Sequence, residues 1–452
     1  MAETDHWGNA ITDREPETVS AIRDFSHGLI AFDRKAGGIM KAAKRDRGSP
    51  LANAYAAILM MWLERADSPA LAAPFLEAAE AAAKGATERE RRIVDVARKW
   101  ASGDIPAVIA AGKEILDLWP SDLVAVKIRQ THMFDLGDAP GMLHSARYGA
   151  KAFPDEPGAL GMLAFGLEES HLLKEAEAVA RRAIEIDRNE GWAQHALAHV
   201  LLTEGRIAEG RQTHFALRDT WEGKNSVLYV HNWWHVALFA ISEGDYDGAL
   251  AIYDDHIHGV QPDYSQDQIN EISLLARLEL VGLDVSPRWE GLADRLEGRV
   301  RDVVNPFLSL QYLYALARAG RGAAADFIDH MRAHAEAGGW SAAMWRDMAV
   351  PAAEGLKAHA EGRWSEAAER LGRALPMIWR GGGSHAQRDV FHQIHLDALI
   401  RAGRFSEAQQ ILMGRLGFEP LSVPNNTALA GVYAALGLPE EAAAAAARAR
   451  RA

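Results

Sequence analysis

Hydrophobic residues recur every three to four positions along the chain, in segments separated by short polar turns. Residues 105–118 are typical, with Ile105, Val108, Ile115 and Leu116 falling on one side of a helical projection. This period predicts α-helices, and no segment shows the strict alternation of a half-buried strand. The sequence therefore predicts an all-α fold.

Regularly spaced small residues mark the turns between the predicted helices. Gly103 and Gly137 are separated by about 34 residues, which is the period of tetratricopeptide repeats. Gly205 follows after twice that distance, with Ser170-His171 at the intervening turn. Further turns, at the same or somewhat longer spacings, fall at Gly244, Gly282, Gly320, Gly362, Gly403 and Gly437.

The residues after each turn follow a common pattern, which is clearest in Gly244-Asp245-Tyr246-Asp247-Gly248-Ala249. A glycine can end the first helix in the left-handed conformation, and the alanine lets two helices approach closely. We therefore expect a tetratricopeptide-type helix-turn-helix solenoid that is strongly curved. Residues 1–50 are expected to form an N-terminal segment with capping helices, and residues 51–452 one continuous superhelical array.

Composition and charge narrow the classes of partner. The 62 acidic and 49 basic residues give a net charge of −13, which disfavours nucleic acid as a partner. No apolar stretch approaches the ~20 residues of a membrane span. The segment 1–20 lacks the apolar core of a secretory signal, so a cytoplasmic location is expected. The absence of cysteine excludes disulfides, thiolate metal sites and cysteine nucleophiles.

Two pairs of histidines lie on consecutive predicted first helices. His195 and His199 are four positions apart, and so are His231 and His235. This spacing places both members of a pair on one helix face, and first helices line the concave surface of such a solenoid. The four imidazoles are candidate ligands for a divalent metal, or His199 and His235 are candidate catalytic groups. The alternative is that all four are packed, hydrogen-bonded interior residues.

Further candidate residues accompany these pairs. Asn232 and Trp234, within the second pair, are candidate ligand contacts together with His195 and His231. Downstream, Asp254 and His256 stand at the end of a predicted helix. Both are candidate catalytic residues, with Asp254 orienting an imidazole. The alternative is that these residues cap the helix or lie in solvent.

A third cluster follows three glycines, in Gly381-Gly382-Gly383-Ser384-His385. Backbone donors at the start of the next helix could bind an anion there. Arg388, Asp389 and His392 follow on a common face, with Arg388 and His392 as candidate ligand contacts and Asp389 as a candidate catalytic carboxylate. The alternative is a flexible turn followed by a structural Arg–Asp–His network. A Walker loop is excluded because its Lys-Ser/Thr ending is missing.

Several of these pieces resemble the tetratricopeptide repeat protein 38 family. The resemblance covers most of the chain and is carried by His231-Asn232-Trp233-Trp234-His235, Ile252-Tyr253-Asp254 and Ala386-Gln387-Arg388-Asp389-Val390-Phe391. It implies the fold and an intracellular setting, and it implies that the histidine pairs belong to a shared pattern. The chain departs from that pattern at residues 307–311, where the family often has Asn-Asp-x-His, so a ligand contact there is not expected.

Three hypotheses of function follow. The leading one is a binding protein whose concave His/Asp/Arg-lined cavity takes a small molecule or a peptide. The second is an enzyme of hydrolase or lyase type with a histidine general base, with or without a divalent metal. The third is a protein-interaction scaffold. None of the three requires a cofactor on sequence grounds, and a homo-oligomer is compatible with each.

Overall fold

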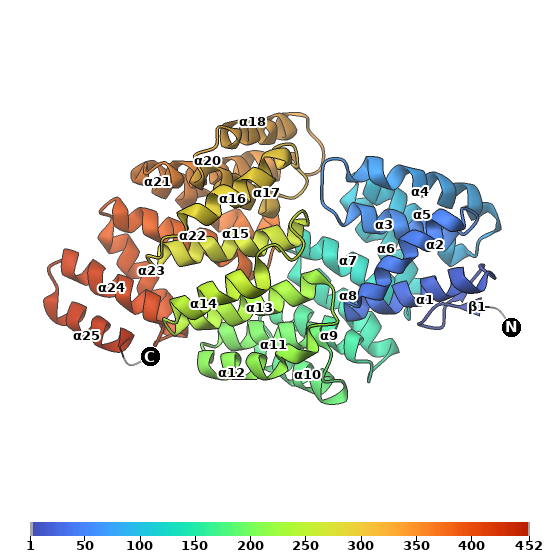
Figure 1. Cartoon of the computed structure of the whole chain (residues 1–452), viewed down its shortest axis with the longest axis horizontal. Coiled ribbons are helices and arrows are strands. Elements are labelled where there is room, and N and C mark those ends of the chain that lie inside the picture. The colour runs from blue at the N-terminus through green and yellow to red at the C-terminus, as the bar shows by residue number, and fades with distance from the viewer. Residues whose placement is uncertain (1–2, 451–452) are drawn as a thin grey trace. The chain divides into compact units, whose positions relative to one another are not determined.

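A computed structural model describes residues 3–450, and nearly all of them lie in helices or in the turns between helices (Figure 1). The prediction of an all-α, tetratricopeptide-type array of helix pairs is confirmed. In the described part of the chain, strands are confined to the antiparallel pair β1 (Glu3–Thr4) and β2 (Ala10–Ile11). No helix among these residues combines the length and hydrophobicity needed to span a bilayer.

The helices follow one another as antiparallel pairs joined by tight turns. After α1 (Pro16–Ala31) and α2 (Ile39–Arg45), the first helices of the pairs are α3 (Pro50–Met61), α5 (Glu88–Ala101), α7 (Leu123–Asp135), α9 (Pro157–Glu169), α11 (Gly191–Thr203), α13 (Ser226–Ser242), α15 (Ser265–Leu280), α17 (Pro306–Arg318), α20 (Val350–Ala360), α22 (His385–Arg401) and α24 (Val423–Ala435). The second helices are α4 (Ser68–Ala82), α6 (Ile105–Leu118), α8 (Ala139–Ala152), α10 (Leu173–Ile186), α12 (Ile207–Leu217), α14 (Tyr246–Ile252), α16 (Ser286–Leu296), α18 (Ala323–Glu336), α21 (Trp364–Ala374), α23 (Phe405–Phe418) and α25 (Pro439–Ala449).

Short helical turns fill most of the remaining connections. The 3₁₀ turns are η1 (Arg34–Gly38), η2 (Ala83–Gly85), η3 (Arg218–Thr220), η5 (Glu297–Arg299) and η7 (Leu375–Gly381). A three-residue helix, α19 (Ala342–Met344), precedes the π turn η6 (Trp345–Ala349), and a second π turn, η4 (Tyr253–Ile257), follows α14.

The predicted turn residues adopt the left-handed backbone conformation. All nine predicted turn glycines have φ between 67° and 99°. At the one predicted turn without glycine, His171 takes the same conformation with φ of 56°. Glycine adopts this conformation without steric penalty, which explains why the repeat period could be recognised from glycine spacing.

The described chain divides into two compact units. The N-terminal unit extends to Leu197 and also includes Asp219–Tyr229, whereas the C-terminal unit consists of Ala198–Arg218 and Val230–Ala452. In the N-terminal unit, Phe25 of α1 stacks on Tyr55 of α3 with ring centroids 4.3 Å apart. In the C-terminal unit, a core of small and aliphatic side chains runs through all the helices from α20 to α25. The expected boundary near residue 50 stays a prediction.

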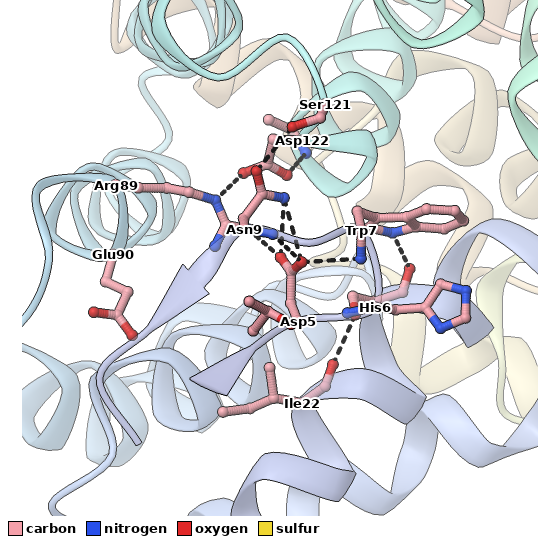
Figure 2. A network of polar contacts seen from close by, with 12 residues as sticks. Asp5, His6, Trp7, Asn9, Ile22, Arg89, Glu90, Ser121 and Asp122 are labelled. Carbon is pink, nitrogen blue, oxygen red and sulfur yellow. Dashed lines mark hydrogen bonds and ion pairs between the residues drawn. The ribbon is translucent and has the colours of Figure 1, made fainter. Parts of the chain in front are cut away.

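The N-terminal hairpin is fixed to the N-terminal unit by a buried ionic network (Figure 2). Arg89 of α5 contacts Asp5 through Nη2 at 2.6 Å and Asp122 through Nε at 2.7 Å, and both carboxylate side chains are fully buried. Asp5 also accepts hydrogen bonds from the backbone amides of Trp7 and Asn9, and the Trp7 indole donates to the Ser26 carbonyl. The hairpin thus joins α1, α5 and the start of α7.

Candidate functional site

The first helices of the C-terminal unit bury polar residues as well as apolar ones. Asn232 and His235 of α13 are fully buried, and so nearly are Asn270, Ser273 and Arg277 of α15. A buried polar group without a partner costs about 1–3 kcal/mol. Each buried polar group needs a partner in the protein or in a ligand, which makes this interior the candidate site.

Three histidines of this unit face one another. The His199 ring lies 4.6 Å from the His235 ring, and the His231 ring lies 4.8 Å from the His235 ring, centroid to centroid. One ring nitrogen from each of the three lies within 4.8 Å of the other two. His385, at the start of α22, joins them with its ring 5.4 Å from that of His199. We call these four residues the histidine cluster.

Hydrogen bonds orient two of these rings. Nδ1 of His231 is 2.8 Å from Oδ1 of Asn270, and the Asn270 amide in turn donates to the Gln266 carbonyl at 2.7 Å. Because the Asn270 nitrogen is the donor to Gln266, its oxygen must accept, so Nδ1 of His231 carries the proton and Nε2 carries the lone pair. Nε2 of His385 is 2.8 Å from the Thr203 hydroxyl.

Burial keeps His199 and His231 uncharged near neutral pH. Loss of hydration lowers the pKa of His199 well below its ordinary value and lowers the pKa of His231 to about 4. Neutral imidazoles retain a lone pair on one ring nitrogen. They can therefore accept a proton or bind a metal ion.

Arg277 contributes a buried positive charge beside the histidine cluster. Its guanidinium bonds to the Ser273 hydroxyl, to the Ser273 carbonyl at 3.1 Å and to the Ala386 carbonyl at 2.8 Å, so these acceptors are all neutral. It also lies over the Trp234 ring, 5.3 Å from its centroid. Burial lowers the pKa of Arg277 to about 10, which still leaves it charged at neutral pH.

Trp234 connects Arg277 to the histidines. Its ring stacks on His231 at 5.1 Å and meets His235 edge to face at 5.0 Å. The indole is fully buried, and its Nε1 finds no hydrogen-bond acceptor among residues 3–450. Arg277 and Trp234 therefore bring two kinds of hydrogen-bond donor next to the cluster.

The carboxylate of Asp389, on α22, pairs with a different arginine, Arg415. Asp389 accepts from both terminal nitrogens of Arg415, at 2.6 and 2.9 Å, and from Gln393. Burial alone would raise the pKa of Asp389, but the charge of Arg415 holds it well below its ordinary value. Asp389 remains ionised and pairs with Arg415, and its charge also stabilises the Arg277 guanidinium through space.

The other predicted residues occupy different surroundings. Asp254, in the π turn η4, accepts two hydrogen bonds from the partly exposed Arg288 at 3.0 and 2.7 Å. His256 of the same turn stacks flat on Trp233 with ring centroids 3.7 Å apart. Arg388 donates to the Gly383 carbonyl, and burial lowers the pKa of His392.

The remaining two predicted positions lie on α11 and α22. His195 stands one turn before His199 on α11 and stacks on Trp192 at 4.2 Å. At the start of α22, Ser384 and Gln387 form a capping box, with Ser384 Oγ accepting from the Gln387 amide and Gln387 Oε1 accepting from the Ser384 amide. These two amides, which an anion at the helix start would need, are thus already hydrogen-bonded.

Sequence reasoning missed three residues of this site, namely Asn270, Arg277 and Thr203. The first two had a recognisable signal, because Asn270, Ser273 and Arg277 recur at i, i+3 and i+7 and so form a polar stripe along α15. The hydroxyl of Thr203 contacts a residue 182 positions away, which no local pattern reveals.

The N-terminal unit holds a separate buried cation. The Lys127 ammonium lies 4.4 Å from the centroid of the Phe32 ring and 4.2 Å from that of the Trp192 ring. Burial lowers the pKa of Lys127 to about 7 and raises the pKa of nearby Glu190 to about 7. We call the group Lys127, Phe32 and Trp192 the lysine clamp.

Comparison with known proteins does not identify the family of this chain. No protein-family model matches the chain. Among solved structures, the human IFIT1 dimer with m7Gppp-AAAA is similar at 15% identity and a TM-score of 0.41, covering 89% of this chain and 90% of that one. The APC/C assembly Cut9–Hcn1 is similar at 12% identity and a TM-score of 0.36, covering 97% and 94%. The P58(IPK) TPR domain has 12% identity and a TM-score of 0.23, covering 81% and 93%. At these values the function of the neighbours carries no weight for this chain.

Proposed function

We propose that the protein is a tetratricopeptide-type binding protein whose C-terminal unit takes a small anionic molecule, or the carboxylate of a peptide, beside the histidine cluster. The observation that carries the proposal is Arg277, a buried guanidinium that is hydrogen-bonded to neutral oxygens. A buried cation is stable when an anion balances its charge, and Asp389, which acts on Arg277 through space, already pairs directly with Arg415.

Trp234 supports the same assignment. Its buried indole N–H would donate to an oxygen of the ligand, and its ring would hold the Arg277 guanidinium in place. His231 and His235, on either side of Trp234 in the sequence, would complete the contacts through their ring nitrogens. We also propose that the chain is a member of the tetratricopeptide repeat protein 38 family and that it lies in the cytoplasm.

Isothermal titration calorimetry tests the proposal, with acetate, succinate and inorganic phosphate as probes and metal-free protein throughout. Arg277→Gln should abolish binding of the preferred probe. Trp234→Phe removes the indole donor and should weaken binding about tenfold, the size of a hydrogen bond to a charged group. Arg288→Gln changes a partly exposed arginine of the same unit and is the matched control. Unchanged binding in Arg277→Gln would refute the proposal.

The second candidate function is a hydrolase or lyase reaction at the same site. The neutral imidazoles of His199 and His231 favour it, because a general base must be unprotonated at the working pH. Turnover of an ester or phosphoester probe that disappears in His235→Gln, but not in the Arg288→Gln control, would identify an enzyme. A scaffold, in contrast, would keep its partner after His199→Gln and His235→Gln are combined.

A further inference from the structure

We infer that His199, His231 and His235 form a binding site for a divalent transition metal, Zn²⁺ being the best match. This inference deepens the proposed function and rests on it in one respect, since the anion would be the partner of the metal as well as of Arg277. Imidazole nitrogens are common zinc ligands, and three protein ligands with one open position are typical of catalytic zinc sites.

The spacing of the ring nitrogens supports this assignment. Tetrahedral zinc with bonds of about 2.0–2.1 Å requires ligand nitrogens about 3.4 Å apart. The three nitrogens already lie within 4.8 Å of one another, so rotations of the rings would bring them to that distance. Two of the ligands lie one turn apart on α13, a rigid element, and the third comes from α11.

Asn270 provides the second argument. Metal-bound histidines usually donate their other ring N–H to an oxygen, which fixes the tautomer and the ring orientation. The Nδ1 of His231 is hydrogen-bonded to Asn270 in this way, and Asn270 is itself fixed by the Gln266 carbonyl. Asn270 is therefore a positioning residue, with Nε2 of His231 as the ligand atom.

Charge balance links the metal to the anion. Three neutral imidazoles leave the double charge of zinc uncompensated, and Arg277 adds a further positive charge near Trp234. An anion at the open coordination position would neutralise part of both. Zinc and the anion should therefore raise each other's affinity by the same factor, as linkage requires.

Titration of chelator-treated protein with Zn²⁺ alone tests the site, with a chromophoric chelator as competitor. We expect one Zn²⁺ per chain in the wild type and none in the double variant His199→Gln, His235→Gln. His359→Gln is the matched control, since His359 is a buried, hydrogen-bonded histidine of the same unit. The Co²⁺ form should show the intense visible absorption of a four-coordinate site.

Variants of Asn270 keep the inference testable if the double variant does not fold. Asn270→Leu removes the acceptor from His231 and should weaken Zn²⁺ binding about 10- to 100-fold, whereas Asn270→Asp keeps an acceptor and should restore it. Absence of stoichiometric Zn²⁺ binding in the wild type, or its persistence in the double variant, would overturn the inference. Anion binding to the metal-free protein that depends on Arg277 would then still stand, so the two proposals fail separately.

Discussion

Replacing Arg89 with methionine should strongly destabilise the N-terminal unit. Methionine keeps most of the length and apolar contact of the side chain but removes the guanidinium that bridges Asp5 and Asp122. Both carboxylate side chains are fully buried, so each would lose its only charged partner in the network of Figure 2. The prediction therefore concerns two uncompensated charges rather than one lost contact.

The size of this loss of stability follows from the burial of the two carboxylates. Removing one partner of a buried ion pair costs about 3–5 kcal/mol, and we expect a loss of about 4 kcal/mol at pH 7 for Arg89→Met. Burial already raises the pKa of Asp5, and without Arg89 this pKa should rise further. The charged carboxylate destabilises the variant above that pKa, so the difference from wild type should shrink as the pH falls to 5.

Urea unfolding followed by circular dichroism measures this loss, combined with hydrogen exchange of amides in β1, β2 and α5. The exchange data are needed because a chain of two units need not unfold in a single step. The triple variant Arg89→Met, Asp5→Asn, Asp122→Asn is the rescue, since it carries no buried charge and the amide oxygen introduced at position 122 can still cap α7. A loss below about 1 kcal/mol for Arg89→Met, or a triple variant no more stable than the single one, would refute the reasoning.

Two further predictions concern single buried charges. Lys127→Met in the lysine clamp should stabilise the protein by about 3 kcal/mol at pH 6, because burial of the charged ammonium is costly there. Near pH 10 the gain should be much smaller, because the buried amine is then uncharged in the wild type. Urea unfolding at both pH values checks this, and a loss of stability at pH 6 would mean that the aromatic contacts outweigh the lost hydration. Burial raises the pKa of Asp13 to about 6. Ionisation of this carboxyl group should therefore lower the stability of the folded protein as the pH rises from about 4 to 6. Asp13→Asn should remove this dependence and gain about 2 kcal/mol at pH 7, and an unchanged pH profile of the melting temperature would contradict it.

The repeat architecture could be predicted because its signals are local. Each turn needs one residue in the left-handed conformation, and Gly103 or Gly244 reports that need by its identity alone. The His231–His235 pair was predictable for the same reason, since i,i+4 spacing within one helix fixes a shared face.

Contacts between distant helices could not be predicted in this way. Asp389 was expected in the candidate site with Arg388, yet its carboxylate pairs with Arg415 on the following helix. Likewise, Arg277 reaches Ala386, which is 109 residues later in the chain. The packing of separate helix pairs decides which charged groups meet in the interior. No periodic pattern in the sequence contains that information.

The anchoring of the N-terminal hairpin also has a consequence for synthesis on the ribosome. Asp5 is made 84 residues before its partner Arg89, and Asp122 follows after 33 more. Chains emerge from the ribosome at about 5–20 residues per second, so the hairpin waits several seconds for the groups that bind it. During that interval the carboxylate of Asp5 lacks the positive charge that Arg89 later supplies. The ionic contacts of the hairpin are therefore completed only after α5 and the start of α7 have been made, and α3 and α4 can pair before then.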